Sequence, residues 1–292
     1  MAETGAVAPP EAARRGGVSK GIFAIVVIVV ALVAFGGGLA LSPTLLPQKP
    51  PLPTLVVGTN TPFPPFESYD SNLNLIGFDV DLANAVALKL NYQIVWKDYQ
   101  DFNALLEAVQ FSGVDMAASS ITSSGGVGAG RNGTMAFSEM YYLSNQGVLI
   151  KGGTAITCSS AGCTPDDLAN HTVAAQSGTS SEFWIDDNLI ATNKTPKSMV
   201  TTYPDVSAVL QALRSGTVQM VIIDLPIANN LASTSAGVLK VAGPIYTNEQ
   251  YSFAFPKTTA GTALRDKVNS ALDALKSGGQ YQTIFNKWFS GT

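Results

Sequence analysis

DFNALLEAVQFSGVDMAASS, residues 101–120, has a pattern that the chain repeats as DVSAVLQALRSGTVQMVIID at residues 205–224. In each copy an aspartate precedes an apolar stripe with helical spacing, a Ser-Gly turn follows, and an apolar strand comes next. Helix and strand both recur at the same offset, 205 − 101 = 104 residues. Two copies are too few for a solenoid, which needs three or more repeats. The repeat therefore predicts two lobes of one architecture rather than a single long domain.

Strands and helices alternate along the rest of the body as well. The predicted strands are residues 55–58, 92–96, 116–120, 172–176, 218–223 and 251–255. The predicted helices are residues 80–90, 101–111, 180–191, 204–214, 260–276 and 279–289. Such alternation is typical of α/β domains in which mostly parallel sheets are covered on both faces.

An uncharged apolar segment, residues 21–41, precedes this body. A helix of that length reaches roughly 30 Å, the thickness of a bilayer core. Arg14, Arg15 and Lys20 lie before it, so we expect residues 1–20 to stay in the cytoplasm and the body to be exported. A cleaved signal peptide is the alternative, but the apolar stretch exceeds the usual ~7–15-residue signal core, which favours a transmembrane anchor.

Charge is distributed unevenly along the chain. Residues 1–50 carry four basic and two acidic side chains, a sum of +2. Because the net charge of the whole chain is −4, the remaining residues sum to −6. An acidic body without a basic run argues against nucleic acid as a partner. Five prolines within residues 42–53 predict a stiff, extended linker between the membrane segment and the body.

Cys158 and Cys163 are the only cysteines, with four residues between them. Outside the cytoplasm, an even and close pair favours a small disulfide loop over two free thiols. A metal site would need further ligands, and the chain has a single histidine, His171, so we expect neither a metal nor another cofactor. Glycosylation stays open, because N-x-Thr sequons begin at Asn132, Asn170 and Asn193.

The repeat also places polar side chains at the ends of two predicted strands. At the offset of 104 residues, Ser120 corresponds to Asp224. In open α/β sheets, ligands bind just beyond the carboxyl ends of the strands. Two facing lobes would present a hydroxyl group from one side and a carboxylate from the other, which predicts a binding cleft between them.

Several further motifs occur in a recognisable order. They are residues 58–67 (GTNTPFPPFE), 77–82 (GFDVDL), 115–122 (DMAASSIT), 137–142 (FSEMYY), 173–179 (VAAQSGT), 223–224 (ID) and the closing 281–289. Together they resemble the polar amino-acid-binding proteins of bacterial-type ABC importers over about residues 54–290. The resemblance implies a periplasmic-binding-protein type II fold, with lobe 1 from residues 52–146 plus 251–292 and lobe 2 from 147–250. Two hinge strands would join the lobes, and the protein would be a monomer that delivers an amino acid to an ABC transporter permease.

The resemblance also assigns the two charges of an amino acid to opposite lobes. Arg131 is implied as the clamp for the α-carboxylate, because a guanidinium gives a carboxylate two parallel charge-assisted hydrogen bonds. The alternative is a surface arginine, since residues 124–130 form a Gly-rich connection longer than is usual. Asp224 is implied as the partner of the α-ammonium, and its alternative role is the N-cap of a helix that begins near Pro226.

The other implied contacts fall into three chemical groups. The hydroxyl groups expected around the carboxylate are those of Ser120, Thr122 and Thr179, with Ser119 and Ser180 as further neighbours. The rings expected to sandwich the ligand side chain are Phe63 and Phe102, although Phe102 also begins an apolar helical stripe typical of a core. The amides expected to set the preference among amino acids are Asn60 and Gln176.

A neutral polar amino acid is the ligand that these residues favour. Family members for cationic amino acids often carry an acid where Asn60 stands, and Asp224 is the only carboxylate expected in the cleft, which disfavours a cationic ligand. No second cation joins Arg131, which disfavours an acidic one.

Two other functions stay open at this point. A cyclohexadienyl-dehydratase-like lyase on the same fold would need a poised acid or base in the cleft. His171 is predicted on a surface turn, and we find no Ser–His or Cys–His pair that would make a nucleophile. A ligand-sensing domain would need a separate signalling partner. The sequence therefore favours an extracytoplasmic, membrane-anchored binding protein over an enzyme.

Overall fold

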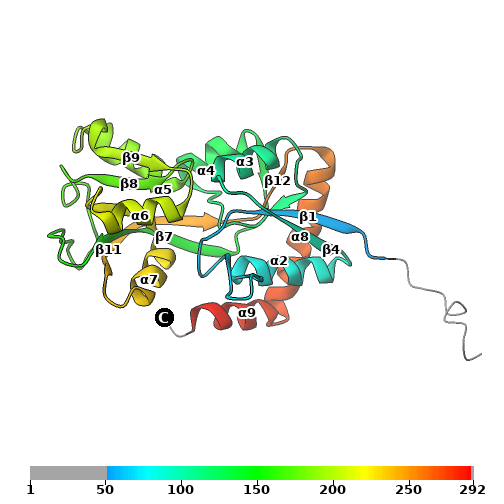
Figure 1. Ribbon diagram of the computed structural model, residues 1–292. Coiled ribbons are helices and arrows are strands. Elements are labelled where there is room, and N and C mark those ends of the chain that lie inside the picture. The colour runs from blue at the N-terminus through cyan, green and yellow to red at the C-terminus, as the bar shows by residue number, and fades with distance from the viewer. Residues whose placement is uncertain (1–50, 291–292) are drawn as a thin grey trace, which may run out of the picture. The chain divides into compact units, whose positions relative to one another are not determined.

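Two five-stranded sheets, each covered by helices, make up the part of the chain that the computed structural model describes, residues 51–290 (Figure 1). The predicted cytoplasmic N-terminus, the anchor or signal segment and most of the linker lie outside these residues. Within them, no helix combines the length and the apolar character needed to cross a membrane.

The first sheet has the strand order β4-β1-β5-β12-β6. Its strands are β1 (Thr54–Thr59), β4 (Gln93–Asp98), β5 (Met116–Ala117), β6 (Met135–Phe137) and β12 (Ala254–Pro256). One face is covered by α2 (Phe78–Lys89), α8 (Thr259–Ser277) and α9 (Gln280–Phe289), and the other by α3 (Phe102–Gln110) and α4 (Gly125–Asn132). Leu55 and Val57 pack with α2 and α8, whereas Val56 packs with α3, as the two-residue period of a strand requires.

The second sheet has the order β11-β7-β10-β8-β9. Its strands are β7 (Tyr142–Lys151), β8 (Val173–Gln176), β9 (Val200–Tyr203), β10 (Met220–Asp224) and β11 (Leu239–Tyr251). Its helices are α5 (Ser180–Ile185), α6 (Val206–Ser215) and α7 (Leu225–Thr234). Met220 and Ile222 pack on the α5 side, and Val221 and Ile223 on the side of α6 and α7. Smaller elements are β2 (Ser68–Tyr69), β3 (Leu75–Ile76), the π-helical turn Asp186–Ile190 and the 3-10 turn Lys197–Met199.

The sequence repeat is a structural repeat. Helix α3 begins at Phe102 and α6 at Val206, while β5 begins at Met116 and β10 at Met220, so the offset of 104 residues holds at both elements. Each helix is capped by its preceding aspartate. The Asp101 side chain accepts hydrogen bonds from the backbone N–H groups of residues 103 and 104, and that of Asp205 accepts one from residue 208. One copy belongs to each sheet.

The prediction of mostly parallel sheets is wrong. Of the eight strand pairings within the two sheets, four are parallel and four antiparallel. The antiparallel ones involve β6, β7, β11 and β12, which flank the two places where the chain passes from one lobe to the other. The predicted strand 251–255 is also broken there, since β11 ends at Tyr251 and β12 begins at Ala254.

The two crossings lie side by side. Strand β7 pairs with β11 as far as Tyr142 opposite Tyr251, where β11 leaves the second sheet. Tyr251 then forms a β-bridge with Thr122, a residue of lobe 1. Polar residues on β11 just before this crossing therefore lie between the lobes.

Candidate functional site

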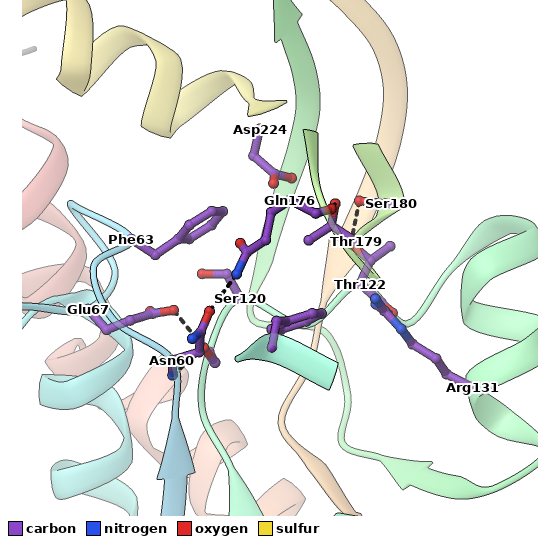
Figure 2. A pocket seen from close by; sticks show the side chains of 12 residues that line it. Asn60, Phe63, Glu67, Ser120, Thr122, Arg131, Gln176, Thr179, Ser180 and Asp224 are labelled. Atoms are coloured by element: carbon purple, nitrogen blue, oxygen red, sulfur yellow. Dashed lines mark hydrogen bonds between the residues drawn. The ribbon is translucent and has the colours of Figure 1, made fainter. Parts of the chain in front are cut away.

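A small cavity between the lobes collects all ten predicted binding residues. Its walls from lobe 1 are Asn60, Phe63, Glu67, Phe102, Ser119, Ser120, Thr122 and Arg131. Its walls from lobe 2 are Gln176, Thr179, Ser180 and Asp224. Figure 2 shows Glu67 and Arg131 at opposite ends of this lining, with Asp224 above Gln176 in the view. The enclosed space is about 20 Å³, and by this measure one water needs roughly 10–15 Å³. An amino acid therefore enters only when the lobes separate or the lining side chains move.

Arg131 is buried at the end of α4 rather than exposed, with 8% of its surface accessible. Its Nη1 donates to the Thr122 carbonyl oxygen at 2.9 Å, and its Nη2 donates to the Gly178 carbonyl oxygen of lobe 2 at 2.8 Å. The guanidinium also lies over the ring of Phe102, 5.5 Å from its centroid. Burial lowers the pKa of Arg131 to about 10, although the negative charges of Glu249 and Asp224 raise it in part. The side chain is therefore cationic at neutral pH.

The Gly-rich connection before Arg131 is helix α4, although glycine is a poor helix former. Gly128 lies so close to Ser123 that a Cβ atom would come within 2.2 Å of its carbonyl group. Helix α4 therefore needs glycine at position 128. Arg131 belongs to the same helix, so the helix positions its guanidinium.

Asp224 ends β10 and is 4% exposed. It precedes α7, yet its side chain caps no N–H group of that helix. Instead Oδ1 accepts hydrogen bonds from the Tyr251 hydroxyl at 2.5 Å and from Gln146 Nε2 at 3.1 Å. Burial first, and then the charge of Glu249, raises the pKa of Asp224 to about 8. The capping role is thus not observed, and the carboxyl group lines the cavity.

The remaining predicted residues occupy the walls in different ways. Ser120 has a positive φ of 48° just past the end of β5, which is shorter than predicted, and its buried Oγ has no hydrogen-bond partner in the described part of the chain. Thr179 caps α5. Gln176 Nε2 donates to Asn60 Oδ1 at 2.8 Å, which joins the lobes directly. Phe102 lines the cavity and packs in a core cluster, so its packing role is observed and its contact with a ligand side chain stays a prediction.

Carboxyl groups near the cleft are more numerous than the sequence indicated. Glu67 lines the cavity and is fully buried. Its Oε1 accepts a hydrogen bond from Ser119 Oγ at 2.8 Å, and its Oε2 has no partner among residues 51–290. Burial, and then the neighbouring Asp79, raises its pKa well above the usual value. Glu249 on β11 is 7% exposed and contacts the wall from behind. The expectation that Asp224 is the only carboxylate in the cleft is therefore wrong. The lack of a second carboxylate can no longer be used as an argument against a cationic ligand.

The cysteine pair and the histidine lie away from this cavity. Cys158 and Cys163 are joined by a disulfide. Gly243 of β11 packs against it so closely that a Cβ there would come within 2.9 Å of Cys163 Sγ. His171 does not line the cavity. Within residues 51–290, no group of three or more His, Cys, Asp or Glu side chains is arranged to hold a metal ion.

We predict that Gly178→Ala weakens amino-acid binding at least tenfold, or about 1.4 kcal/mol. A Cβ at Gly178 would lie 2.1 Å from Asn103 Oδ1 of the opposite lobe, so closure requires the Asn103 side chain to move and to give up its hydrogen bond to Ser177 Oγ. Calorimetric titration of the variant measures the effect, and removing the obstructing amide in Gly178→Ala/Asn103→Ala should restore part of the affinity.

Gly216→Ala is the matched control for this variant. Gly216 also has a positive φ, 80° against 78° at Gly178, but nothing lies within 4 Å of its missing Cβ. It carries the same backbone strain, about 1–2 kcal/mol, without the contact between lobes. Equal affinities for the two variants would show that the Asn103 contact does not limit closure.

Comparison with known families and structures identifies proteins to which this chain is similar. The family described as bacterial extracellular solute-binding proteins, family 3, matches residues 55–291. A probable histidine-binding protein of Neisseria gonorrhoeae is 31% identical over 237 residues, which cover 80% of this chain and 82% of that protein. A putative ABC transporter arginine-binding protein 2 of Escherichia coli (strain K12) is 27% identical over 90% of this chain and 98% of its own.

The solved structures agree with these relatives. An ancestral arginine-binding protein bound to glutamine superposes with a TM-score of 0.71 at 30% identity, covering 81% of this chain and 97% of its own. All three of these proteins are named for binding an amino acid and none for catalysis. The two-lobed fold predicted from the sequence is thereby confirmed.

Proposed function

The chain belongs to the bacterial extracellular solute-binding proteins of family 3, and from this premise we propose that it captures an amino acid between its lobes and delivers it to an ABC transporter permease. The observation that carries the proposal is the meeting of Arg131 and Asp224 on one cavity, each buried and each from a different lobe. In this proposal Arg131 binds the α-carboxylate and Asp224 the α-ammonium, and the protein works as a monomer.

Binding and closure are coupled in this proposal. A ligand whose two charges contact different lobes binds the closed form better than the open one, and it shifts the hinge equilibrium by that difference in affinity. The bonds from Gln176 to Asn60 and from Arg131 to Gly178 hold the lobes together in the arrangement described here. The permease would then recognise the closed form.

We place this binding body outside the cytoplasm and tethered to the membrane. The support is the uncharged segment 21–41, the basic side chains before it and the proline-rich linker after it. A lyase on the same fold receives no such support, because the named relatives are binding proteins.

A thermal-shift screen of the purified full chain in detergent against the twenty common amino acids tests the function. A ligand at 100 times its Kd stabilises the folded state by about 2.7 kcal/mol, which corresponds to a rise in melting temperature of roughly 5–10 °C for a body of this size. We expect one amino acid, or a small group of similar ones, to give such a shift, and calorimetry to give one site per chain. No shift with any of the twenty would refute the proposal.

A further inference from the structure

Glu249 is a buried carboxylate directly behind the cavity that the proposed function leaves without a role. A register irregularity of β11 between Ile245 and Glu249, with Asn248 at a positive φ, precedes it. Such bulges re-aim side chains, and here Glu249 and Tyr251 are buried on the same side of the strand as it crosses between lobes. Of the four ion pairs found among residues 51–290, none includes Glu249 or Asp224.

The partners of Glu249 are neutral donors from both lobes. Oε2 accepts hydrogen bonds from Ser180 Oγ at 2.6 Å and from Thr122 Oγ1 at 3.0 Å. Oε1 accepts one from Gln146 Nε2 at 2.9 Å. Thr122 and Ser180 both line the cavity, one from each lobe, so Glu249 holds the two hydroxyl groups from the side away from the ligand.

This arrangement determines whether the two hydroxyl groups donate or accept hydrogen bonds. A hydroxyl has one proton and two lone pairs, and a carboxylate only accepts hydrogen bonds. Thr122 and Ser180 give their protons to Glu249, so only their lone pairs are left for other partners. The two oxygens lie 3.3 Å apart, Ser180 Oγ also accepts from Gln146 Nε2, and both residues line the cavity. These groups therefore accept hydrogen bonds from a ligand rather than donate to it, which does not suit the carboxylate contact that the sequence suggested for Thr122.

The accepting oxygens converge with Asp224. Gln146 Nε2 lies 3.2 Å from Ser180 Oγ, 3.1 Å from Asp224 Oδ1 and 2.9 Å from Glu249 Oε1, so these three acceptors surround a single amide nitrogen. Of these acceptors, those of Ser180 and Asp224 belong to cavity-lining residues, and Thr122 Oγ1 lies 3.3 Å from Ser180 Oγ. A ligand group that faces this wall is therefore favoured if it has several N–H donors and a positive charge. An ammonium group has three donors and no acceptor.

We propose that Glu249 is a specificity-determining positioning residue, which acts through the hydroxyl groups of Thr122 and Ser180 to make this wall of the cavity a site for the ligand's α-ammonium. The inference rests on the proposed function, since it assumes an amino acid in the cavity. Arg131 then binds the α-carboxylate without help from these two hydroxyls. Glu249 thereby makes the protein discriminate against carboxylic acids that lack the amine.

The test compares each amino acid with its 2-hydroxy acid, in which a hydroxyl replaces the α-amine. The probe is the amino acid that the full-length wild-type chain binds most tightly among the twenty, together with its 2-hydroxy counterpart, and the readout is the ratio of the two Kd values from calorimetry. We expect the wild type to prefer the amine at least 100-fold. In Glu249→Gln, the amide offers a donor to the hydroxyls, which turn their protons toward the cavity, and the ratio should fall at least tenfold.

Further variants separate this positioning role from a structural one. Thr122→Val removes one accepting oxygen and leaves Glu249 in place, so it should also lower the ratio. The double variant Glu249→Gln/Thr122→Val should lower the ratio of the two Kd values by less than the two single effects combined, because both substitutions act through the same hydroxyl. Glu107→Gln, an exposed position on α3, is the matched control and should keep the wild-type ratio. If Glu249→Gln does not fold, Thr122→Val and Ser180→Ala decide the question.

The outcomes separate two failures. Equal losses for the amino acid and the hydroxy acid in Glu249→Gln, or an unchanged ratio in the folded variants, would overturn the role of Glu249 while leaving amino-acid binding intact. If wild type binds none of the twenty amino acids, the proposed function fails and this inference fails with it.

Discussion

Arg131→Ala should lower the affinity for the amino acid more than 100-fold. Arg131 is the only cationic side chain that lines the cavity within residues 51–290. Its loss leaves the ligand's carboxylate buried without a counter-charge, which costs roughly 3 kcal/mol or more, and each 1.4 kcal/mol is a factor of ten in Kd. Calorimetric titration measures the loss, and the melting temperature of the free protein shows whether the variant is folded.

Arg131→Lys tests the geometry rather than the charge. Lysine keeps a cation at this position but lacks the planar fork that lets arginine hold two carbonyl oxygens and still face a carboxylate. We expect an affinity between those of the wild type and the alanine variant. Arg214→Ala, at an exposed position on α6, is the control and should bind like the wild type. A folded Arg131→Ala protein with unchanged affinity would show that the carboxylate is bound elsewhere.

Much of this site was predictable because its residues belong to short local motifs. The paired aspartate caps at Asp101 and Asp205 and the two apolar strands revealed the two-lobe architecture from helix and strand periodicity alone. The ends of those strands then indicated where a ligand binds. The resemblance supplied individual residues, and the structure brings all ten to one cavity, while their roles stay predictions.

The parts that were missed depend on contacts distant in the sequence. Glu249 lies behind the cavity wall because of a bulge and an antiparallel pairing with β7, and neither is visible in a local pattern. Glu67 belongs to the motif at residues 58–67, but only its burial and its Oε2 atom, which has no hydrogen-bond partner among residues 51–290, mark it as a cavity residue. Helix α4 was not expected because four of the six residues before Arg131 are glycines, which are poor helix formers, and the close approach of Gly128 to Ser123 that requires one of them is not visible in the sequence.

Asp224→Asn should also cost more than 100-fold in affinity, and it should change the pH dependence of both binding and stability. The amide keeps the size of the side chain but removes the negative charge opposite the ligand's ammonium, so the buried cation loses its counter-charge. Asp187→Asn, an exposed carboxylate outside the cavity, is the control and should bind normally.

The stability effect has a definite sign. The pKa of Asp224 is raised from its usual 3.8 to about 8 in the folded protein, so the folded state holds this proton more tightly than the unfolded state does. The wild type therefore loses this stabilisation as pH rises from about 4 to about 8. Asp224→Asn cannot ionise, so its melting temperature should exceed that of the wild type at pH 8, and the difference should shrink toward pH 4.

Binding should show the opposite trend with pH. The ligand's ammonium favours the ionised form of Asp224, so below about pH 8 the free protein must release a proton when the amino acid binds. Affinity of the wild type should thus rise with pH up to about 8, by at most about tenfold per pH unit. Calorimetry at pH 7 in two buffers of different ionisation enthalpy measures the released proton directly, and Asp224→Asn should release none. A wild-type protein that binds without releasing a proton would mean that Asp224 is already ionised in the open cleft, and its part in binding would then be charge pairing without proton transfer.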